Sequence, residues 1–369
     1  MEPALPDIVP SPRVYLDHAA TTAMTPAAIA AVGEGMAAWA NPSSPHAEGR
    51  RARAALEAAR RSIAAAYGWR HELLLTSGAS ESLDIALGRS VAARRLVSAV
   101  EHDAAMRAAG AADRVPVGAD GVVDIDALAD MLADGVRTIV GVQWANSETG
   151  VRQPIARIAG VVHGAGSLLL VDAAQMPATA ALGDELVEHS DFVALSAHKR
   201  GGPPGIGALL VRDLAMLHPS GGQERGYRAG TENLPAALGY AAALAAGEPV
   251  ARWAMLRDTL DDAVRRSGGI VVADASDRHP AIASYRLPGV AAAAQLIRLD
   301  AAGFAVSAGS ACSSGSMKPS HVLGAMGWDE PASREVIRVS FGRTTGAAEV
   351  DGFIAAWRDV ARATRTFAA

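Results

Sequence analysis

Short apolar runs alternate with longer segments of helical periodicity through the first two thirds of the chain. The runs predict strands at residues 72–76, 95–99, 138–143, 168–172, 192–196 and 206–211, and helical segments lie between them, for example at 80–91 and 154–163. This alternation is typical of βαβ units, so we expect an α/β fold with a mostly parallel sheet. Several runs are apolar at consecutive positions, as expected of strands with helices on both faces.

The pattern changes near residues 248–249. Beyond them we expect a helix at 251–266, strands at 269–273 and 281–286, a helix at 291–301, a Gly/Ser-rich loop at 307–316, a strand at 336–341 and a helix at 347–365. The chain has 369 residues, whereas a single core stops growing at about 250–300 residues. We therefore predict a large domain, residues 16–248, and a smaller α+β domain formed by residues 1–15 and 249–369.

Composition and charge exclude several classes of protein. Half of the residues are hydrophobic and a fifth are charged, which is typical of a folded globular chain. The formal net charge is −5 and no basic block stands out, so nucleic acid is not an expected partner. The single cysteine, Cys312, cannot form a disulfide or a cysteine-based metal site within one chain. No feature of the sequence implies a bound metal.

The distribution of apolar residues also bears on location. The N-terminus carries acids and prolines where an export signal would need a cationic start and an apolar run. The longest apolar stretch, 234–246, is shorter than the roughly 20 residues that cross a bilayer. These features predict a cytoplasmic protein that does not interact with membranes.

Polar clusters follow the predicted strands, and ligands of parallel sheets bind at the carboxyl ends of the strands. Ser77-Gly78-Ala79-Ser80 follows the strand at 72–76 and opens a helix. Free backbone N–H groups and the positive end of the helix dipole can bind a phosphate there. A capping box with Ser80 as the cap is the alternative.

Two further clusters place an acid and a base at strand ends. Asp172 ends the strand at 168–172, where a buried carboxylate needs a cationic partner; a turn-forming aspartate is the alternative. Lys199 follows Ser196 and His198 and precedes a stiff loop of glycines and prolines. A lysine in a half-buried cleft has a lowered pKa and can form a Schiff base. The alternative is a surface lysine on a turn.

The last two clusters hold a histidine and the thiol. His102 follows Glu101 after the strand at 95–99, although a single histidine is often only a hydrogen-bonded polar residue. Cys312 lies among Gly, Ala and Ser residues that offer no apolar pocket. Free cysteines are usually buried and inert, but an accessible thiol on a mobile loop can be a nucleophile.

The order of these clusters resembles that of pyridoxal-phosphate enzymes with the aspartate aminotransferase fold. Val171-Asp172-Ala173-Ala174-Gln175 followed by Ser196-Ala197-His198-Lys199 closely resembles the cysteine desulfurases of the class V aminotransferase family. The resemblance extends from residues 15–22 through 41–46 to 337–343. It implies fold type I of the pyridoxal-phosphate enzymes, with a mostly parallel seven-stranded sheet, and it implies pyridoxal 5'-phosphate as the cofactor.

The resemblance also implies a role for each matched residue near the cofactor. Lys199 would hold the cofactor as an internal aldimine and move protons. Asp172 would pair with the pyridine nitrogen, and Gln175 would hydrogen-bond the phenolic oxygen. His102 would stack on the ring and act in acid–base steps. The phosphate would be held by Ala79, Ser80, Ser196, His198 and, from a second subunit, Thr231, so the site would require a homodimer.

On the substrate side, the resemblance implies that Arg338 binds the carboxylate of L-cysteine, a task suited to a planar guanidinium, with Arg343 as the second choice. Asn41 and His46 match a loop near the substrate. Cys312 matches the cysteine that takes up the sulfur as a persulfide while alanine leaves. Its loop resembles the longer form of desulfurases that deliver sulfur to scaffold proteins for iron–sulfur cluster or thio-cofactor assembly.

The chain departs from the family pattern at two places. Asn146-Ser147-Glu148 stands where two asparagines usually precede the glutamate, so Ser147 would replace an amide contact to the cofactor with a shorter hydroxyl. Pro204 stands where a lysine is frequent, which predicts a stiffer loop. A selenocysteine lyase and a class V transaminase, both using Lys199 without Cys312, are alternative activities, and a cofactor-binding subunit without turnover is a non-enzymatic alternative.

Overall fold

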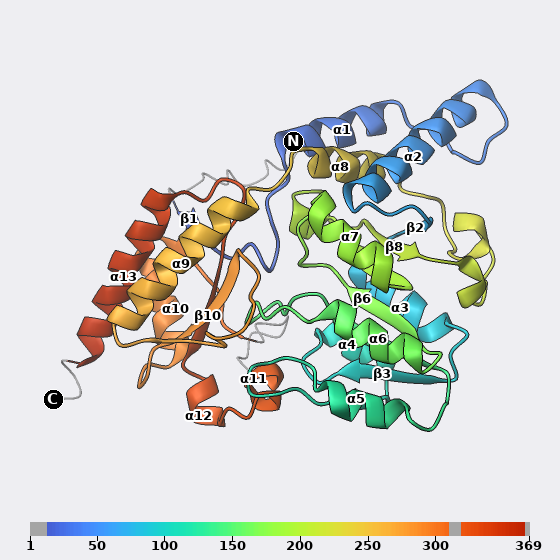
Figure 1. Cartoon of the computed structure of the whole chain (residues 1–369). Helices are drawn as coiled ribbons and strands as arrows, with labels where there is room; N and C mark the ends of the chain where they lie inside the picture. Colours follow the sequence, from blue (N-terminus) through green and yellow to red (C-terminus); the bar gives the residue numbers. More distant parts are fainter. Residues whose placement is uncertain (1–12, 310–318, 366–369) are drawn as a thin grey trace.

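The computed structural model describes residues 13–309 and 319–365, which form two lobes (Figure 1). A seven-stranded sheet with the spatial order β2-β8-β7-β6-β5-β3-β4 forms the large lobe. β8 runs antiparallel to both of its neighbours, and the other pairs are parallel. The predicted mostly parallel, seven-stranded sheet is therefore confirmed. Its strands are β2 (Glu72–Thr76), β3 (Arg94–Ser98), β4 (Asp113–Val115), β5 (Thr138–Gln143), β6 (Leu168–Asp172), β7 (Phe192–Ser196) and β8 (Gly207–Val211).

Helices cover both faces of this sheet, as predicted. Side chains of successive strand residues point to opposite faces. In β6, Leu168 and Leu170 join the buried cluster of α3 (Ala79–Arg89) and α4 (Asp103–Ala109). Leu169 and Val171 join the cluster on the other face. That face is covered by α2 (Ala47–Ala66), α5 (Ile125–Leu132), α6 (Ile155–Gly164), α7 (Ala180–His189) and α8 (Leu234–Ala245), and α1 (Pro26–Ala37) packs on α8.

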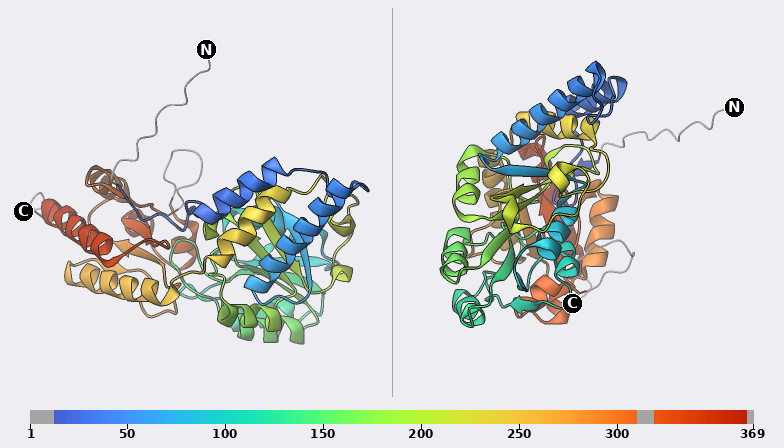
Figure 2. Two further views of the ribbon diagram at one scale, coloured as in Figure 1. Left: turned by 90° about the horizontal axis from the view of Figure 1, so that it is seen from above. Right: turned by 90° about the vertical axis from the view of Figure 1, so that its right-hand side faces the viewer.

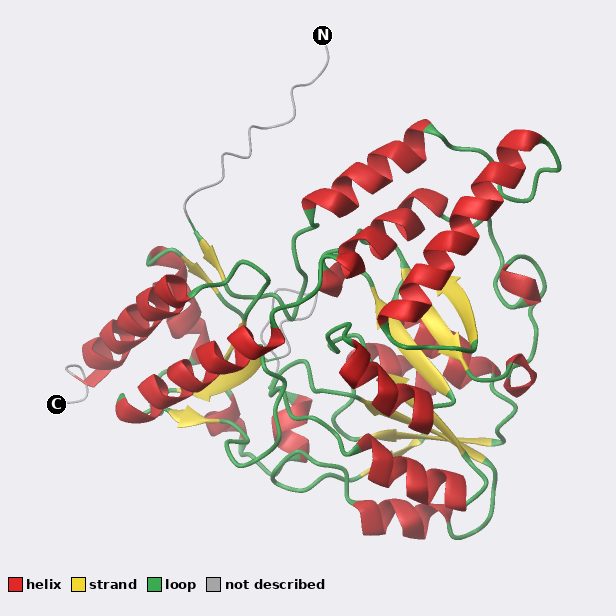
Figure 3. Ribbon diagram, turned by 45° about the horizontal axis from the view of Figure 1, so that its top comes forward, coloured by secondary structure: helices red, strands yellow, loops and turns green. Residues whose placement is uncertain are grey.

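The small lobe has a buried cluster of its own, which includes Trp253, Phe353 and Trp357. The cluster lies between an antiparallel sheet of the order β12-β10-β9 and three helices. This three-stranded sheet lies apart from the seven-stranded sheet of the large lobe (Figures 2 and 3). Leu16, which we assigned to the large domain, packs in this cluster; the domain boundaries stay a prediction. The elements are β9 (Ile270–Val271), β10 (Ile282–Arg286), β12 (Val336–Ser340), α9 (Val250–Arg266), α10 (Ala292–Ala301) and α13 (Ala347–Arg365).

Besides the longer helices α1 and α2, which precede the first predicted strand, several short elements were not predicted from periodicity. They are β1 (Val14–Tyr15), which pairs with β11 (Phe304–Ala305), together with β4, α11 (His321–Ala325) and α12 (Glu330–Ser333). Two to five residues are too few for a period to show. The strand predicted at 269–273 is only two residues long, and Ala273 has a left-handed φ of 52°. None of the helices in the described ranges is long and apolar enough to cross a membrane.

Candidate active site

A cavity of about 630 Å³ lies at the carboxyl ends of the parallel strands. Asp172 ends β6 and Ser196 ends β7, and both line the cavity. Arg338 of β12 borders it from the small lobe. The cavity therefore lies between the lobes, at the sheet edge where the sequence predicted a ligand. The predicted site residues that line it are Ala79, Ser80, His102, Ser147, Asp172, Ser196, His198, Lys199 and Arg338.

The N-terminus of α3 borders this cavity. The N-cap of the helix is Gly78, which has no side chain to satisfy the first N–H groups. The alternative of a capping box with Ser80 as the cap is therefore wrong. Nothing lies within 4 Å of the position that a Cβ of Gly78 would occupy. The free N–H groups and the helix dipole, with the hydroxyls of Ser80 and Ser196 nearby, form a site for an anion such as a phosphate.

Lys199 and Asp172 bring opposite charges to the same cavity. Lys199 lies in a short 3-10 turn, His198–Arg200, directly after β7. Burial lowers the pKa of its amine to about 8; Asp172 opposes this shift, and Arg338 and Arg200 add to it. A lysine with an accessible neutral form can attack a carbonyl carbon. The only other lysine in the sequence is Lys318.

Two neutral imidazoles flank the lysine. His102 caps α4, with Nδ1 accepting a hydrogen bond from Ala104 N at 3.1 Å, so Nε2 carries the proton. Burial lowers the pKa of His102, and the positive charge of Lys199 adds to this effect. In His198, Nδ1 lies 3.0 Å from Thr21 Oγ1, and burial lowers the pKa to about 4. His102 is therefore both a helix cap and a residue of the cavity.

Arg338 is held in place by two contacts with distant segments of the chain. Its Nη2 donates to Asp17 Oδ1 at 2.6 Å, and its Nη1 donates to Ser147 O at 3.0 Å. Nε is buried and has no partner among the described residues. The guanidinium is thus oriented while several of its N–H groups stay available. The sequence assigned no role to Asp17, although it lies in the segment 15–22 that resembles the family.

Two buried carboxyl groups to which the sequence assigned no role also line the cavity. Glu101 Oε1 accepts hydrogen bonds from Ser98 Oγ and Gln143 N, whereas Oε2 has no partner in the described structure. Burial raises the pKa of Glu101 to about 8, against these hydrogen bonds. Glu148 accepts a hydrogen bond from Ser320 Oγ, and burial raises its pKa. Both follow strand ends, which is the signal that could have identified them.

Several predicted residues do not line this cavity within a single chain. Gln175 donates from Nε2 to Ala19 O at 2.9 Å. Arg343 donates from Nε to Gly247 O at 2.7 Å, so it contacts the connection between the lobes rather than the cavity. Three further predicted residues, Asn41, His46 and Thr231, are exposed. Asn41 accepts a hydrogen bond from Ser43 N, and His46 caps α2.

Cys312 and most of the loop predicted at 307–316 lie outside the described residues. Ser307 and Gly309, which precede that segment, line the cavity, and so does His321, which follows it.

Pyridoxal 5'-phosphate fits the groups around the cavity. The cofactor needs an anion site for its phosphate, an amine for its aldehyde carbon and an acid for its pyridine nitrogen. The uncapped N-terminus of α3, Lys199 and Asp172 provide these three groups. The cavity volume is typical of small-molecule sites, which measure about 300–1,000 Å³. Within residues 13–309 and 319–365, no group of three His, Cys, Asp or Glu side chains could hold a metal ion.

Comparisons with known proteins agree with this site. The class-V aminotransferase family model matches residues 14–353. A cysteine desulfurase of Cereibacter sphaeroides is 39% identical over 365 residues, which cover 92% of this chain and 93% of that protein. An IscS-like cysteine desulfurase of Mycobacterium tuberculosis is 37% identical over 369 residues, which cover 91% and 93%.

Solved structures show the same relationship. The NifS-like protein from Rickettsia africae has a TM-score of 0.84 and 27% identity, and the match covers 94% of this chain and 99% of that one. Enzymes of this family depend on pyridoxal phosphate, so the protein is a pyridoxal-phosphate enzyme. The chain belongs to the class-V aminotransferase family.

Proposed function

We propose that this protein is a cysteine desulfurase that transfers the sulfur of L-cysteine to Cys312. The C–S bond of the substrate breaks, its Cβ gains a hydrogen, and a new S–S bond forms on the enzyme. L-cysteine and one thiol thus give L-alanine and one persulfide. The observation that carries the proposal is that Lys199, Asp172 and Arg338 meet the N-terminus of α3 at one cavity. The curated relatives that bear this name match nine tenths of the chain.

The large lobe holds the cofactor in this proposal. When bound, pyridoxal phosphate withdraws electrons from the attached amino acid and so weakens the bonds at its Cα. Lys199 would hold the cofactor covalently, and Asp172 would keep the pyridine nitrogen protonated. Gln175, which we expect to hydrogen-bond the phenolic oxygen, donates one amide hydrogen to Ala19 O and does not line the large cavity within one chain. The hydroxyl of Ser147 replaces the amide usual at this position. The phosphate is held by Ala79, Ser80, Ser196 and His198.

The small lobe binds the substrate carboxylate through Arg338. A guanidinium has five N–H donors in a fixed plane, and among the described residues two of those of Arg338 have acceptors, Asp17 Oδ1 and Ser147 O. The remaining donors can bind a carboxylate in a bidentate manner. Arg343 is held elsewhere, by Gly247 O and by Ala243 O. Arg338 is therefore the better candidate of the two.

Proton transfer is assigned to Lys199 and His102. The lowered pKa of Lys199, about 8, gives a substantial neutral fraction near neutral pH, as an acid–base group requires. The ring of His102 is neutral, and its Nε2 proton is free to donate because Nδ1 is occupied by Ala104 N. The thiol of Cys312 receives the sulfur in its thiolate form.

We further propose that the active unit is a homodimer. Thr231, Asn41 and His46 are exposed in the single chain, and a second copy gives them a partner. α1 and the residues after it present exposed apolar side chains at Ile29, Met36 and Trp39. Apolar exposure of this kind is typical of contact surfaces. The persulfide then passes to a sulfur-acceptor or iron–sulfur scaffold protein, in the cytoplasm, where thiols stay reduced.

Product analysis tests the proposed reaction. The purified protein is given L-cysteine, pyridoxal phosphate and a reductant, beside the variants Lys199→Ala and Cys312→Ala. We expect alanine and sulfide in equal amounts, with both lost in each variant. Turnover of selenocysteine that survives Cys312→Ala would instead indicate a selenocysteine lyase. Amino transfer to a keto acid that is independent of Cys312 would indicate a transaminase.

A further inference from the structure

A buried ionic cluster joins the two lobes next to the lysine. Its centre is Glu248, in the connection between α8 and α9, with a side chain only 3% exposed. The carboxylate accepts hydrogen bonds from Arg200 Nη1 at 3.1 and 3.2 Å. Its Oε1 lies 3.8 Å from Arg343 Nη2, and its Oε2 accepts from Ala178 N at 3.0 Å. One carboxylate therefore contacts an arginine of each lobe.

The two arginines adjoin residues that the proposed reaction uses. Arg200 directly follows Lys199 in the turn after β7. Arg343 lies on the segment that leaves β12, the strand that carries Arg338. A cavity of about 10 Å³, room for roughly one water, is lined by Lys199 and by all three charged residues of the cluster. Lys199 thus borders both this small cavity and the large one.

The cluster depends on the single carboxylate. Arg343 also donates to Gly247 O and Ala243 O at the C-terminal end of α8, where carbonyl groups favour a cation. Burial lowers the pKa of Arg343, and Glu248 opposes this shift. Without Glu248, two buried guanidinium groups would lack their shared counter-charge, and such uncompensated charges are strongly unfavourable.

We propose that Glu248 is a positioning residue for the reaction: by holding Arg200 and Arg343 on one carboxylate, it fixes Lys199 relative to Arg338 across the two lobes. This inference rests on the proposed roles of Lys199 and Arg338. Its consequence is that a change at Glu248, which touches neither cofactor nor substrate, alters both substrate binding and the titration of the lysine.

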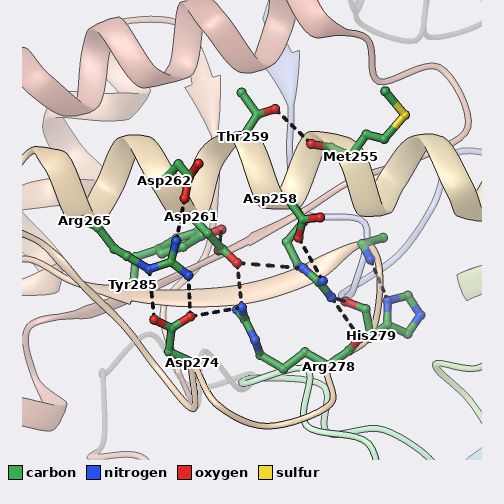
Figure 4. A network of polar contacts seen from close by, with 12 residues as sticks. Met255, Asp258, Thr259, Asp261, Asp262, Arg265, Asp274, Arg278, His279 and Tyr285 are labelled. Atoms are coloured by element: carbon green, nitrogen blue, oxygen red, sulfur yellow. Dashed lines mark hydrogen bonds and ion pairs between the residues drawn. The ribbon is translucent and has the colours of Figure 1, made fainter.

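A second cluster in the small lobe provides a matched control (Figure 4). Asp261 has a side chain 3% exposed and accepts hydrogen bonds from Arg278 Nη2 at 2.5 Å and Tyr285 Oη at 2.8 Å. It lines neither the large cavity nor the small one. Loss of its charge should therefore destabilise the fold without moving Lys199 against Arg338.

The test compares Glu248→Gln, Glu248→Asp and Asp261→Asn. On each holoenzyme we measure KM and kcat for L-cysteine and the thermal midpoint. On each apoprotein we measure the rate of covalent attachment of pyridoxal phosphate against pH, which reports the neutral fraction of Lys199. The groups that face this lysine, Asp172, Arg338, Arg200 and the imidazoles of His102 and His198, are the same in all variants.

We expect Glu248→Gln to raise KM roughly tenfold or more, because small displacements of binding groups are costly. It should also lower the pH midpoint of cofactor attachment, because two arginine charges near Lys199 lose their counter-charge. Glu248→Asp keeps the charge but is one methylene shorter, so KM should rise while the midpoint stays. Asp261→Asn should change only the thermal midpoint.

Wild-type KM and pH midpoint in Glu248→Gln, as in Asp261→Asn, would overturn the inference. If Glu248→Gln yields no folded protein, the KM of Glu248→Asp decides, and an unchanged value contradicts the positioning role. A failure of the proposed function looks different, because the wild-type holoenzyme would then release no alanine and sulfide from L-cysteine, whereas the pH midpoint of cofactor attachment could still be compared between Glu248→Gln and Asp261→Asn.

Discussion

The two lobes contribute to the cavity in different ways. From the large lobe come the ends of several strands of one sheet, whose pairing places Asp172, Ser196 and the turn with Lys199 side by side. From the small lobe come Arg338 of β12, which reaches Ser147 O of the large lobe, and the residues Ser307, Gly309 and His321. The residues proposed to bind the cofactor thus lie at the edge of one sheet, whereas the position of Arg338, proposed to bind the substrate, depends on how the lobes are held together.

Because of this difference, we expect substitutions in the two lobes to impair the enzyme in different ways. Changes in the large lobe should abolish cofactor binding or chemistry. Changes in the small lobe or between the lobes should weaken substrate binding or, at Cys312, stop sulfur transfer, while the cofactor stays in place. Each of the following predictions tests this division.

The largest effect is expected in the large lobe. Lys199→Ala should abolish turnover and covalent cofactor binding, because no other amine lines the described cavity. The measurements are alanine release and the absorption of the lysine-bound cofactor. Lys318→Ala, which removes the only other lysine, is the control and should retain both. Equal losses in the two variants would refute the assignment.

The thiol separates sulfur transfer from cofactor chemistry. Cys312→Ala should retain the bound cofactor and lose persulfide formation, since the chain has no other cysteine and the thiolate is the nucleophile. Labelling with a thiol-specific reagent after incubation with L-cysteine measures the persulfide directly. Normal sulfide release by this variant would remove Cys312 from the proposed reaction.

Arg338→Met tests the contribution of the small lobe. Hydrogen bonds to charged groups are worth about 1.5–3 kcal/mol, so we expect KM for L-cysteine to rise roughly 10- to 100-fold while the cofactor stays bound. Arg286→Met is the control. Arg286 lies on the neighbouring strand β10, its Nε donates to Glu335 Oε2 at 2.7 Å, and it does not line the cavity. A kcat loss with an unchanged KM would place Arg338 in the chemistry instead.

The pH dependence of cofactor attachment tests the buried state of Lys199. Only the neutral amine attacks the aldehyde, and burial lowers the pKa of this amine to about 8. The rate for the apoprotein should therefore rise about tenfold per pH unit below pH 8 and level off above it. A rate that keeps rising to pH 10 would indicate an ordinary, exposed lysine.

The smallest effect concerns the stability of the large lobe. Burial raises the pKa of Glu101 to about 8, so the folded state keeps a proton that the unfolded chain releases above its ordinary pKa. The free energy of unfolding should then fall as the pH rises from about 5 to 8. Glu101→Gln cannot lose that proton, so its stability should fall less over the same range. Parallel curves from denaturant titrations of both proteins would contradict the buried, protonated state.

The sequence predicted the large lobe and its side of the cavity well. Consecutive apolar positions identified the central strands, and polar residues at their ends identified Asp172, His102 and Lys199, because parallel strands end at a common edge. β4 was missed because it has three residues, of which Asp113 and Arg114 are charged.

The contacts between the lobes were less predictable. Arg338 was found only through the resemblance, and its partner Asp17 lies 321 positions away in the sequence. Glu248 lies where the sequence pattern changes, but the sequence indicated no role for it. A local periodicity cannot predict a contact among Arg200, Glu248 and Arg343, which lie far apart in the sequence. The raised pKa values of Glu101 and Glu148 result from tertiary burial. Their positions after strand ends suggest such burial but do not establish it.

The most direct test of the account is to identify the residue that binds the cofactor. The holoenzyme is reduced with borohydride, which fixes the cofactor to its lysine, and the digested peptides are weighed by mass spectrometry. With two lysines in the chain, the result is unambiguous. The account predicts that the peptide with Lys199 carries the added mass and that the peptide with Lys318 does not. Modification of Lys318, or of neither peptide in a protein that binds the cofactor, would contradict it.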